Sequence, residues 1–142
     1  MPINGPWGAF NFVVEIDGID EAGFAEVSGL SFETELIRYR NGNDKANSVR
    51  SLPGLHKVGD VTLKRGLVAS TSFYQWLRGI ADGQDDVRNV VIVLHDETHQ
   101  PVKRFKLTRA RIIKHVSGPL NAAANQVAME EIVLAHERLE IE

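Results

Sequence analysis

The sequence predicts a mainly β protein in which two antiparallel sheets pack together, as a sandwich or partly open barrel, with one flanking helix and an extended hairpin arm. Three observations predict this fold. Apolar residues alternate with period two along much of the chain, one stretch alone has clear helical periodicity, and a long polar insertion separates two strand-like segments. The length of 142 residues suits one domain over residues 1–142.

Composition narrows the classes of protein that need to be considered. The net charge of −3 disfavours a generic nucleic-acid binder, and the absence of cysteine excludes disulfides and thiolate chemistry. The longest apolar runs, such as residues 90–94, are far shorter than the roughly 20 residues that cross a bilayer. The first ten residues lack the features of a secretory signal. We therefore expect a chain made in the cytoplasm without a signal peptide and not inserted into a membrane.

The N-terminal part is predicted to be an arm followed by two strands. Residues 1–9 form the arm, and its Trp7 either folds back on its own domain or packs on a neighbour. Residues 10–16 alternate as a strand, and Asp17-Gly18 follows as a tight turn. Residues 24–28 form a short second strand.

A long hairpin-like stretch, residues 26–66, comes next and organises the chain. Strand-like residues 31–40 and 56–65 flank about fifteen polar residues, and an insertion of that size in a small domain is usually functional or disordered. The apolar side changes from even to odd positions at Leu36-Ile37. Because strand side chains alternate strictly, this switch predicts a bulge or a passage into a second environment. We expect the arm to reach another copy of the chain.

The second half is predicted to contain one helix and three strands. Residues 70–81 place Phe73, Trp76, Leu77 and Ile80 on one stripe, which must pack on a sheet. Gly83 suits the end of this helix. The strands are predicted over residues 90–94, 102–116 and 126–140.

The residue types that carry chemistry form no convincing site. His95 and His99 lie at a strand end and turn, where their spacing does not bring two imidazoles together. Glu130 and Glu131 are adjacent on a strand and so face opposite sides, which argues against an acid/base pair. We predict no catalytic residue, cofactor or metal, and no enzyme activity. The basic residues 103–114 leave one alternative open, a β-barrel binding module for nucleic acid or a small ligand.

Five segments in a fixed order resemble one known family. They are residues 10–18 (FNFVVEIDG), 22–30 (AGFAEVSGL), 52–55 (LPGL), 62–66 (TLKRG) and 133–137 (VLAHE). Together they resemble the tail tube proteins of contractile phage tails and phage tail-like injection systems. The resemblance implies two packed antiparallel sheets with a flanking helix, in agreement with the periodicity.

The resemblance also implies an assembly. Six copies would form a ring, rings would stack into a hollow tube, and a contractile sheath would drive the tube through a target envelope. Implied partners are the chain itself, the sheath protein, baseplate or spike and tube-capping proteins, and effector cargo or genome in the lumen. The particle would be a phage tail or an extracellular or cell-anchored injection system, and the chain a main tube protein or an initiator paralogue; the sequence decides neither question.

By the same analogy, residues 38–57 would be an extended loop between subunits, and Trp7 would join it in those contacts. The lumen would be lined by Thr62 and Lys64 or by Arg109 and Arg111. The implied inter-subunit residues are Trp7, Arg38, Tyr39, Arg40, Asn41, Gly42, Asn43, Asp44, Lys45, Leu52, Pro53, Gly54, Leu55, His56 and Lys57.

Overall fold

The computed structural model describes residues 5–9, 11–17, 23–39, 42, 50–123 and 125–142. It contains nine strands and one helix over these residues. The strands are β1 (Phe12–Ile16), β2 (Glu26–Ser28), β3 (Phe32–Tyr39), β4 (Arg50–Val58), β5 (Val61–Gly66), β6 (Arg88–His95), β7 (Pro101–Ser117), β8 (Met129–Ala135) and β9 (Arg138–Ile141), and the helix is α1 (Ser72–Ala81).

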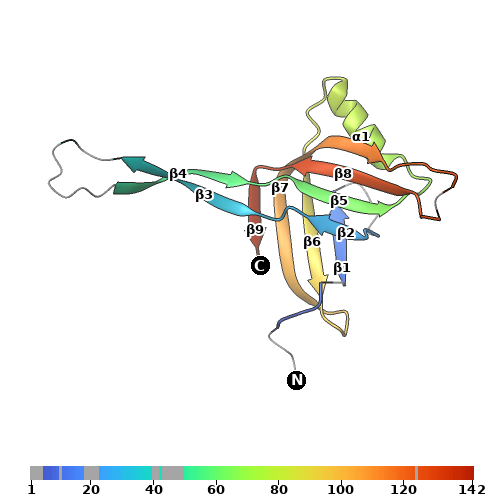
Figure 1. Cartoon of the computed structure of the whole chain (residues 1–142), viewed down its shortest axis with the longest axis horizontal. Helices are drawn as coiled ribbons and strands as arrows, with labels where there is room; N and C mark the ends of the chain where they lie inside the picture. The colour runs from blue at the N-terminus through green and yellow to red at the C-terminus, as the bar shows by residue number, and fades with distance from the viewer. Residues whose placement is uncertain (1–4, 10, 18–22, 40–41, 43–49, 124) are drawn as a thin grey trace.

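The predicted mainly β architecture is confirmed. A seven-stranded antiparallel sheet has the order β1-β6-β7-β8-β5-β2, with β9 also beside β7, and β3 and β4 form a separate two-stranded sheet. The strands described do not form a closed barrel. The two halves of the large sheet run in different directions: β5 and β8 follow the long axis, whereas β1 and β6 lie across it (Figure 1).

A bend in β7 joins these two halves. Its first part pairs with β6 and β9, and its last part pairs with β8. Between the two parts, β7 contains one more residue than β6, because Val90 pairs with Leu107 but Arg88 pairs with Ala110. Arg109, which lies at this point, has a φ of 53°. An extra residue of this kind bends a strand and increases its twist, which turns one long strand into the corner between two layers.

The core lies between the two halves of the sheet and α1. Alternate residues of β5 and β8 are buried, including Val61, Leu63 and Leu134. The predicted helical stripe supplies Phe73 and Trp76, which are 0% and 1% exposed, so the helix covers the core as expected. It begins at Ser72, two residues later than predicted.

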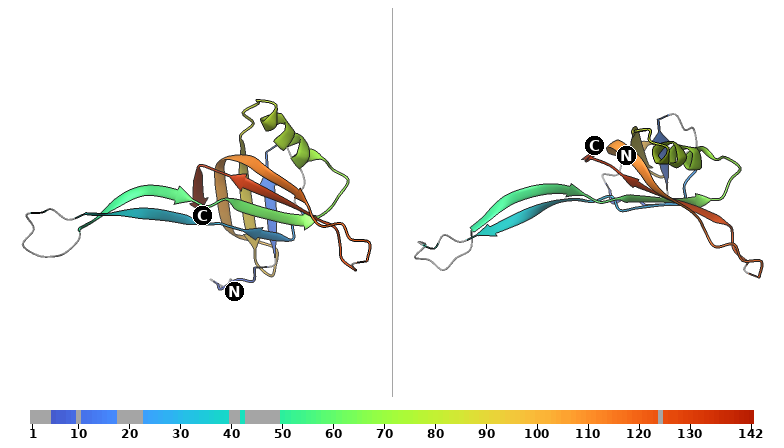
Figure 2. Two further views of the ribbon diagram at one scale, coloured as in Figure 1. Left: turned by 45° about the horizontal axis from the view of Figure 1, so that its top comes forward. Right: turned by 90° about the horizontal axis from the view of Figure 1, so that it is seen from above.

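The hairpin predicted over residues 26–66 is confirmed, with two corrections to its strands. β2 continues into β3 and β4 into β5, so the base of the hairpin is part of the large sheet while β3 and β4 extend beyond it (Figures 1 and 2). β4 already begins at Arg50, so the polar insertion is shorter than expected. The predicted strand 56–65 is two strands, separated at Gly59 and Asp60.

The last predicted strand, residues 126–140, is likewise wrong in its extent. It begins at Met129 and is interrupted between β8 and β9. His136 lies in the interruption, 8% exposed, with Nε2 2.9 Å from the carbonyl oxygen of Gly59 and Nδ1 3.3 Å from that of Arg138. The two interruptions therefore lie side by side, and one imidazole contacts backbone at both.

The remaining strands agree with the sequence to within a few residues. The strand predicted over 102–116 is β7, and the one predicted over 90–94 is β6, longer by residues at both ends. The second strand covers the end of the predicted 24–28 segment. The first begins at Phe12 in the described chain, and Phe10 lies outside the described residues.

Candidate assembly interface

The hairpin formed by β3 and β4 carries the largest group of exposed apolar side chains. All its described side chains from residue 32 to residue 38 are exposed, and so are most of those from residue 51 to residue 57. A soluble chain rarely leaves so many large apolar groups uncovered on one projecting element, which marks a contact surface. The exposed apolar residues are Phe32, Leu36, Ile37, Leu52 and Leu55.

Contacts across the hairpin hold its base in one shape. The Phe32 and His56 rings stack with centroids 5.8 Å apart, and Thr34 Oγ1 lies 2.9 Å from His56 Nδ1. Lys57 Nζ lies 3.8 Å from a carboxylate oxygen of Glu35. His56 and Lys57, both expected to face another subunit, are therefore engaged within the hairpin itself in the isolated chain.

The middle of the hairpin contains a bulge, but it lies in β4 and not in β3, where the change of side at Leu36-Ile37 had predicted it. Thr34 pairs with His56 but Leu36 pairs with Pro53, so β4 holds an extra residue at this point. Gly54 lies so close to Glu35 that an added Cβ would be 2.8 Å from its carbonyl oxygen. This extra residue reverses the alternation of β4, whereas β3 continues through Leu36 and Ile37 without an insertion. These two exposed side chains therefore face opposite sides of the hairpin.

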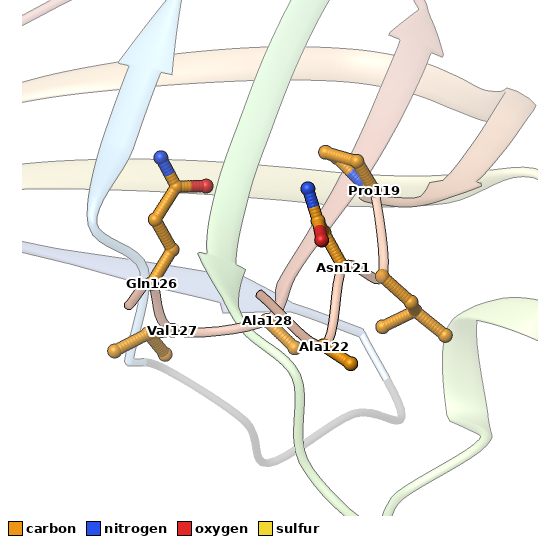
Figure 3. A pocket seen from close by; sticks show the side chains of 7 residues that line it. Pro119, Asn121, Ala122, Gln126, Val127 and Ala128 are labelled. Carbon is orange, nitrogen blue, oxygen red and sulfur yellow. The ribbon is translucent and has the colours of Figure 1, made fainter. Parts of the chain in front are cut away.

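The opposite end of the molecule holds a shallow pocket. Its volume is about 450 Å³, and it lies in the connection between β7 and β8 (Figure 3). Each of its lining residues is uncharged. They are Pro119, Leu120, Asn121, Ala122, Gln126, Val127 and Ala128.

Thr62 and Lys64, one of the two pairs expected to line a lumen, lie on the face of the sheet that points away from the core. Both are half-buried, whereas their neighbours Val61 and Leu63 are fully buried. Lys64 Nζ lies 4.0 Å from Glu26 across the β2–β5 pair. This face is polar but not strongly charged.

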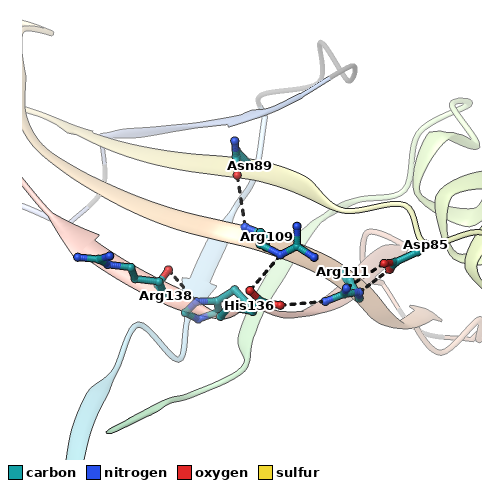
Figure 4. A network of polar contacts seen from close by, with 7 residues as sticks. Asp85, Asn89, Arg109, Arg111, His136 and Arg138 are labelled. Carbon is teal, nitrogen blue, oxygen red and sulfur yellow. Dashed lines mark hydrogen bonds and ion pairs between the residues drawn. The ribbon is translucent and has the colours of Figure 1, made fainter.

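Arg109 and Arg111, the other pair, lie at the bend of β7 and converge on one acidic residue. Glu137 lies 3.0 Å from Arg109 Nε and 3.6 Å from Arg111 Nη1 (Figure 4). Arg111 Nε also donates to Asp85 at 2.8 Å, and this hydrogen bond and the arginine charge hold the pKa of the Asp85 carboxyl below its usual range. The two arginines therefore contact the same Glu137, and carboxylates engage both of them.

The core face of β5 and β8 carries a buried charged cluster that was not predicted from the sequence. Arg65 Nε donates to Glu130 at 3.0 Å, and His115 Nε2 lies 2.8 Å from the other oxygen of Glu130. Arg65 and Glu130 are 3% and 4% exposed. Their partners lie far apart in the sequence, so period-two alternation could place them on the inner face but could not pair them. Glu131, in contrast, faces the other side, as expected.

Two histidines are covered by the fold. His136 is buried, and His115 is largely covered in the cluster with Glu130. Trp7 is half-buried, and its ring lies close to Gly5. Of the remaining predicted interface residues, Arg40, Asn41, Asn43, Asp44 and Lys45 lie outside the described residues, as does the side chain of Tyr39.

Over the part of the chain that the structure describes, no group of three or more metal-ligating side chains comes together. Over the same residues, no helix has the length and apolar character needed to span a membrane.

The family of the chain follows from its similarity to known proteins. The family model of the T4-like virus tail tube protein gp19 matches residues 8–140. The chain belongs to this tail tube family. A search of curated protein sequences gave no match.

Solved structures similar to this tail tube protein include chains of contractile injection systems. A chain of the anti-feeding prophage (AFP) baseplate is 26% identical with a TM-score of 0.84, over 99% of this chain and 97% of that chain. A chain of the extended PVC sheath-tube complex, an extracellular contractile injection system, is 24% identical with a TM-score of 0.85, over 96% and 91%. A chain of the AFP tube-terminating cap is 23% identical with a TM-score of 0.85, over 100% and 94%.

The family assignment explains the distribution of side chains in this tail tube protein. A tube subunit is structural, so its informative residues are those on uncovered surfaces and sheet edges rather than in a catalytic cleft. Three such uncovered surfaces are present over the described residues. They are the hairpin, the uncharged pocket at the far end of the molecule and the polar outer face of β5.

Proposed function

We propose that six copies of this tail tube protein close into a ring by pairing the two free edges of one sheet, and that such rings stack into a hollow tube. The observation that carries the proposal is the edge structure of the segment β2-β5-β8-β7. The 6-fold symmetry of the AFP baseplate structure, one of whose chains is 26% identical to this one, supports the number of copies.

The two edges have no partner over the described part of the chain. β2 is the last strand on its side of the sheet. On the other side, residues 112–117 of β7 pair with β8, but β6 ends its pairing at Ala110. Exposed edges of this kind invite pairing with another chain, and closing a barrel removes them.

The direction of the strands suits closure by rotation. β2, β5, β8 and β7 alternate in direction, since each neighbouring pair is antiparallel. A copy rotated about the ring axis keeps its strand directions. The first strand of the next copy therefore runs antiparallel to β7, and the ring continues the pattern of the monomer without a break.

Ring closure also assigns a side to the lumen. The core face of β5 is covered by α1 and the other half of the sheet, which places that bulk outside the ring. Thr62 and Lys64, on the opposite face, then face inward. They suit the lumen better than Arg109 and Arg111, because carboxylates lie 3.0 Å and 2.8 Å from those arginines, closer than the 4.0 Å between Lys64 and Glu26. A polar lining keeps effector cargo or a genome from sticking to the wall.

Stacking would use the hairpin, residues 38–57 above all, because it extends past the body of the molecule along its long axis (Figure 1). Trp7 and the arm 1–9 would add contacts to a neighbour. By similarity to the PVC and AFP structures, we further propose that the tube binds a sheath protein, a baseplate and a terminating cap, within a phage tail or an injection particle.

The edge pairing can be tested with a single substitution in β7. The amide of Gly118 donates to Met129 in β8 at 2.6 Å, so by strand alternation the amide of Ser117 points to the free edge. Ser117→Pro removes that donor and leaves the bonds to β8 intact. We expect rings and tubes of the wild type by negative-stain microscopy, and their loss in this variant.

Ser117→Ala is the matched control, because it keeps the amide and should assemble normally. A wild type that stays monomeric and binds oligonucleotides tightly would contradict the tube function and support a binding module. Normal rings from Ser117→Pro would show that β7 does not form the joint.

A further inference from the structure

We propose that the uncharged segment 52–55 of one copy inserts into the pocket between β7 and β8 of a copy in the next ring. This inference rests on the proposed stacking of rings and names the surface that receives the hairpin. It is carried by the positions, the exposure and the chemistry of the two ends of the molecule.

Three residues stand out by exposure. Leu55 is 79% exposed, Leu120 77% and Val127 76%, the highest values for large apolar side chains over the described residues. Leu55 belongs to the hairpin, and the other two line the pocket. Exposed apolar groups gathered at two sites on a soluble chain indicate surfaces that are covered in an assembly.

The two sites lie at opposite ends of the same strands. In the β5–β8 pair, Val61 faces Leu134 near the hairpin, and Gly66 faces Met129 at the far end. β4 enters β5 next to Val61, whereas the pocket residues lead into Met129. The hairpin and the connection between β7 and β8, whose residues line the pocket, are accordingly at opposite ends of the long axis (Figure 1). A contact between unlike ends leaves each copy with one unused hairpin or pocket, so it propagates into a filament.

The chemistry of the two surfaces matches. The pocket contains no ionisable side chain. Residues 52–55 (LPGL) contain none either, although charged or titratable residues flank this segment at Arg50, His56 and Lys57. Burying an uncharged segment in an uncharged pocket avoids the desolvation cost that an unpaired charge would bring.

The β4 bulge explains why Leu55 is the residue presented. The extra residue of β4 falls between the partners of Thr34 and Leu36, and a bulge re-aims the side chains beside it. Pro53 has no backbone N–H, so this stretch places little demand on a partner for hydrogen bonds. At the pocket, the side-chain amides of Asn121 and Gln126 lie among the apolar lining residues and offer donors to the incoming backbone (Figure 3).

Two charge-introducing variants test the pair of surfaces, Leu55→Asp on the hairpin and Val127→Asp in the pocket. Each alone should form rings but no tubes in negative-stain images, with more than a tenfold loss of sedimenting polymer. Mixed together, a Leu55→Asp ring still offers a pocket and a Val127→Asp ring still offers a hairpin. The mixture should therefore give stacks of two rings and nothing longer.

The absence of native cysteine allows a direct second measurement. The double variant Leu55→Cys, Val127→Cys should form a ladder of cross-linked chains on oxidation, while each single variant should form none. Ile141→Asp is a control for added charge, because Ile141 is 53% exposed but lies on β9 away from both sites.

These experiments distinguish a failure of the proposed ring from a failure of the proposed contact between hairpin and pocket. A wild type without rings would contradict the ring function itself. Normal tubes from Leu55→Asp or Val127→Asp, loss of rings in either variant, or a mixture without two-ring stacks would overturn the pocket as the receiving surface and leave ring formation standing.

Discussion

Arg65 and Glu130 face each other across β5 and β8 and form an ion pair inside the core, with Arg65 Nε 3.0 Å from Glu130 Oε2. Both side chains are 4% exposed. The Arg65 guanidinium also lies 4.4 Å from the centroid of the Phe73 ring, and His115 approaches Glu130 from β7. The pair therefore ties α1 to both strands.

Replacing Glu130 by Ala should destabilise the monomer by about 3–5 kcal/mol, because it leaves the Arg65 charge buried without its carboxylate. Urea unfolding followed by circular dichroism measures the change. The control is Glu131→Ala on the outer face, for which we expect a change within about 0.5 kcal/mol. A similar small change for Glu130→Ala would mean that water reaches Arg65.

The double replacement Arg65→Met, Glu130→Leu should be close to neutral. Buried ion pairs are often matched or exceeded in stability by apolar side chains of similar volume, because no charge then needs to be desolvated. Unfolding of this variant beside Glu130→Ala separates the cost of an unpaired charge from the net value of the pair. A double variant as unstable as Glu130→Ala would show that the pair itself stabilises the core.

Trp76→Ala should cost about 3–5 kcal/mol of unfolding free energy, since Trp76 is 1% exposed and fills the core beneath α1. Trp76→Phe keeps much of the packing but loses the hydrogen bond that Trp76 Nε1 donates to the carbonyl oxygen of Asp86, 2.9 Å away. Loss of this hydrogen bond should cost about 1 kcal/mol in addition to the packing loss. Arg78→Ala on the exposed face of the helix is the control. Equal effects of Trp76→Ala and Arg78→Ala would place the helix outside the core.

Gly29→Ala should weaken the base of the hairpin by more than about 1 kcal/mol. Gly29 has a φ of +90°, which L side chains rarely adopt, and an added Cβ would collide with the carbonyl oxygen of Asp60. Gly23→Ala is the matched control, because nothing lies within 4 Å of its added Cβ. Thermal unfolding of both variants checks the prediction, and equal melting temperatures would contradict it.

The parts of the fold that follow local periodicity were predictable from the sequence. Phe73 and Trp76 are three residues apart on one helical stripe. The change of side at Leu36-Ile37 predicts an irregularity in this part of the hairpin, although the extra residue itself lies in β4. In each case the deciding residues are neighbours in the chain, so the pattern is visible in the sequence.

The interruptions of the strands were not predictable, since their cause lies on another strand. His136 contacts the carbonyl oxygen of Gly59, 77 residues away in the sequence, and Arg65 finds Glu130 at a separation of 65. The bend at Arg109 likewise depends on the register against β6. No periodic pattern within one segment contains this information.

The candidate interface was likewise predictable only in part. The hairpin is visible in the sequence because a long polar insertion lies between two alternating segments. The pocket is not, because small and uncharged residues such as Ala122 and Ala128 carry no periodic signal and read as an ordinary connection. Two structural observations mark the pocket as a contact surface. Leu120 and Val127 are highly exposed, and the pocket lies at the opposite end of the molecule from the hairpin.

Deleting residues 42–51 should abolish tubes while sparing the fold of the monomer. Of the described residues of β3 and β4, only Val58 at the base packs against the core, so the outer hairpin adds little to its stability. Closing the shortened loop costs slightly less entropy, a change below about 1 kcal/mol. Circular dichroism should thus show a melting temperature within a few degrees of the wild type, while negative-stain images show rings without tubes. Normal tubes from the deletion variant would show that residues 42–51 are not needed for stacking, and a strongly lowered melting temperature would place them within the packing of their own subunit.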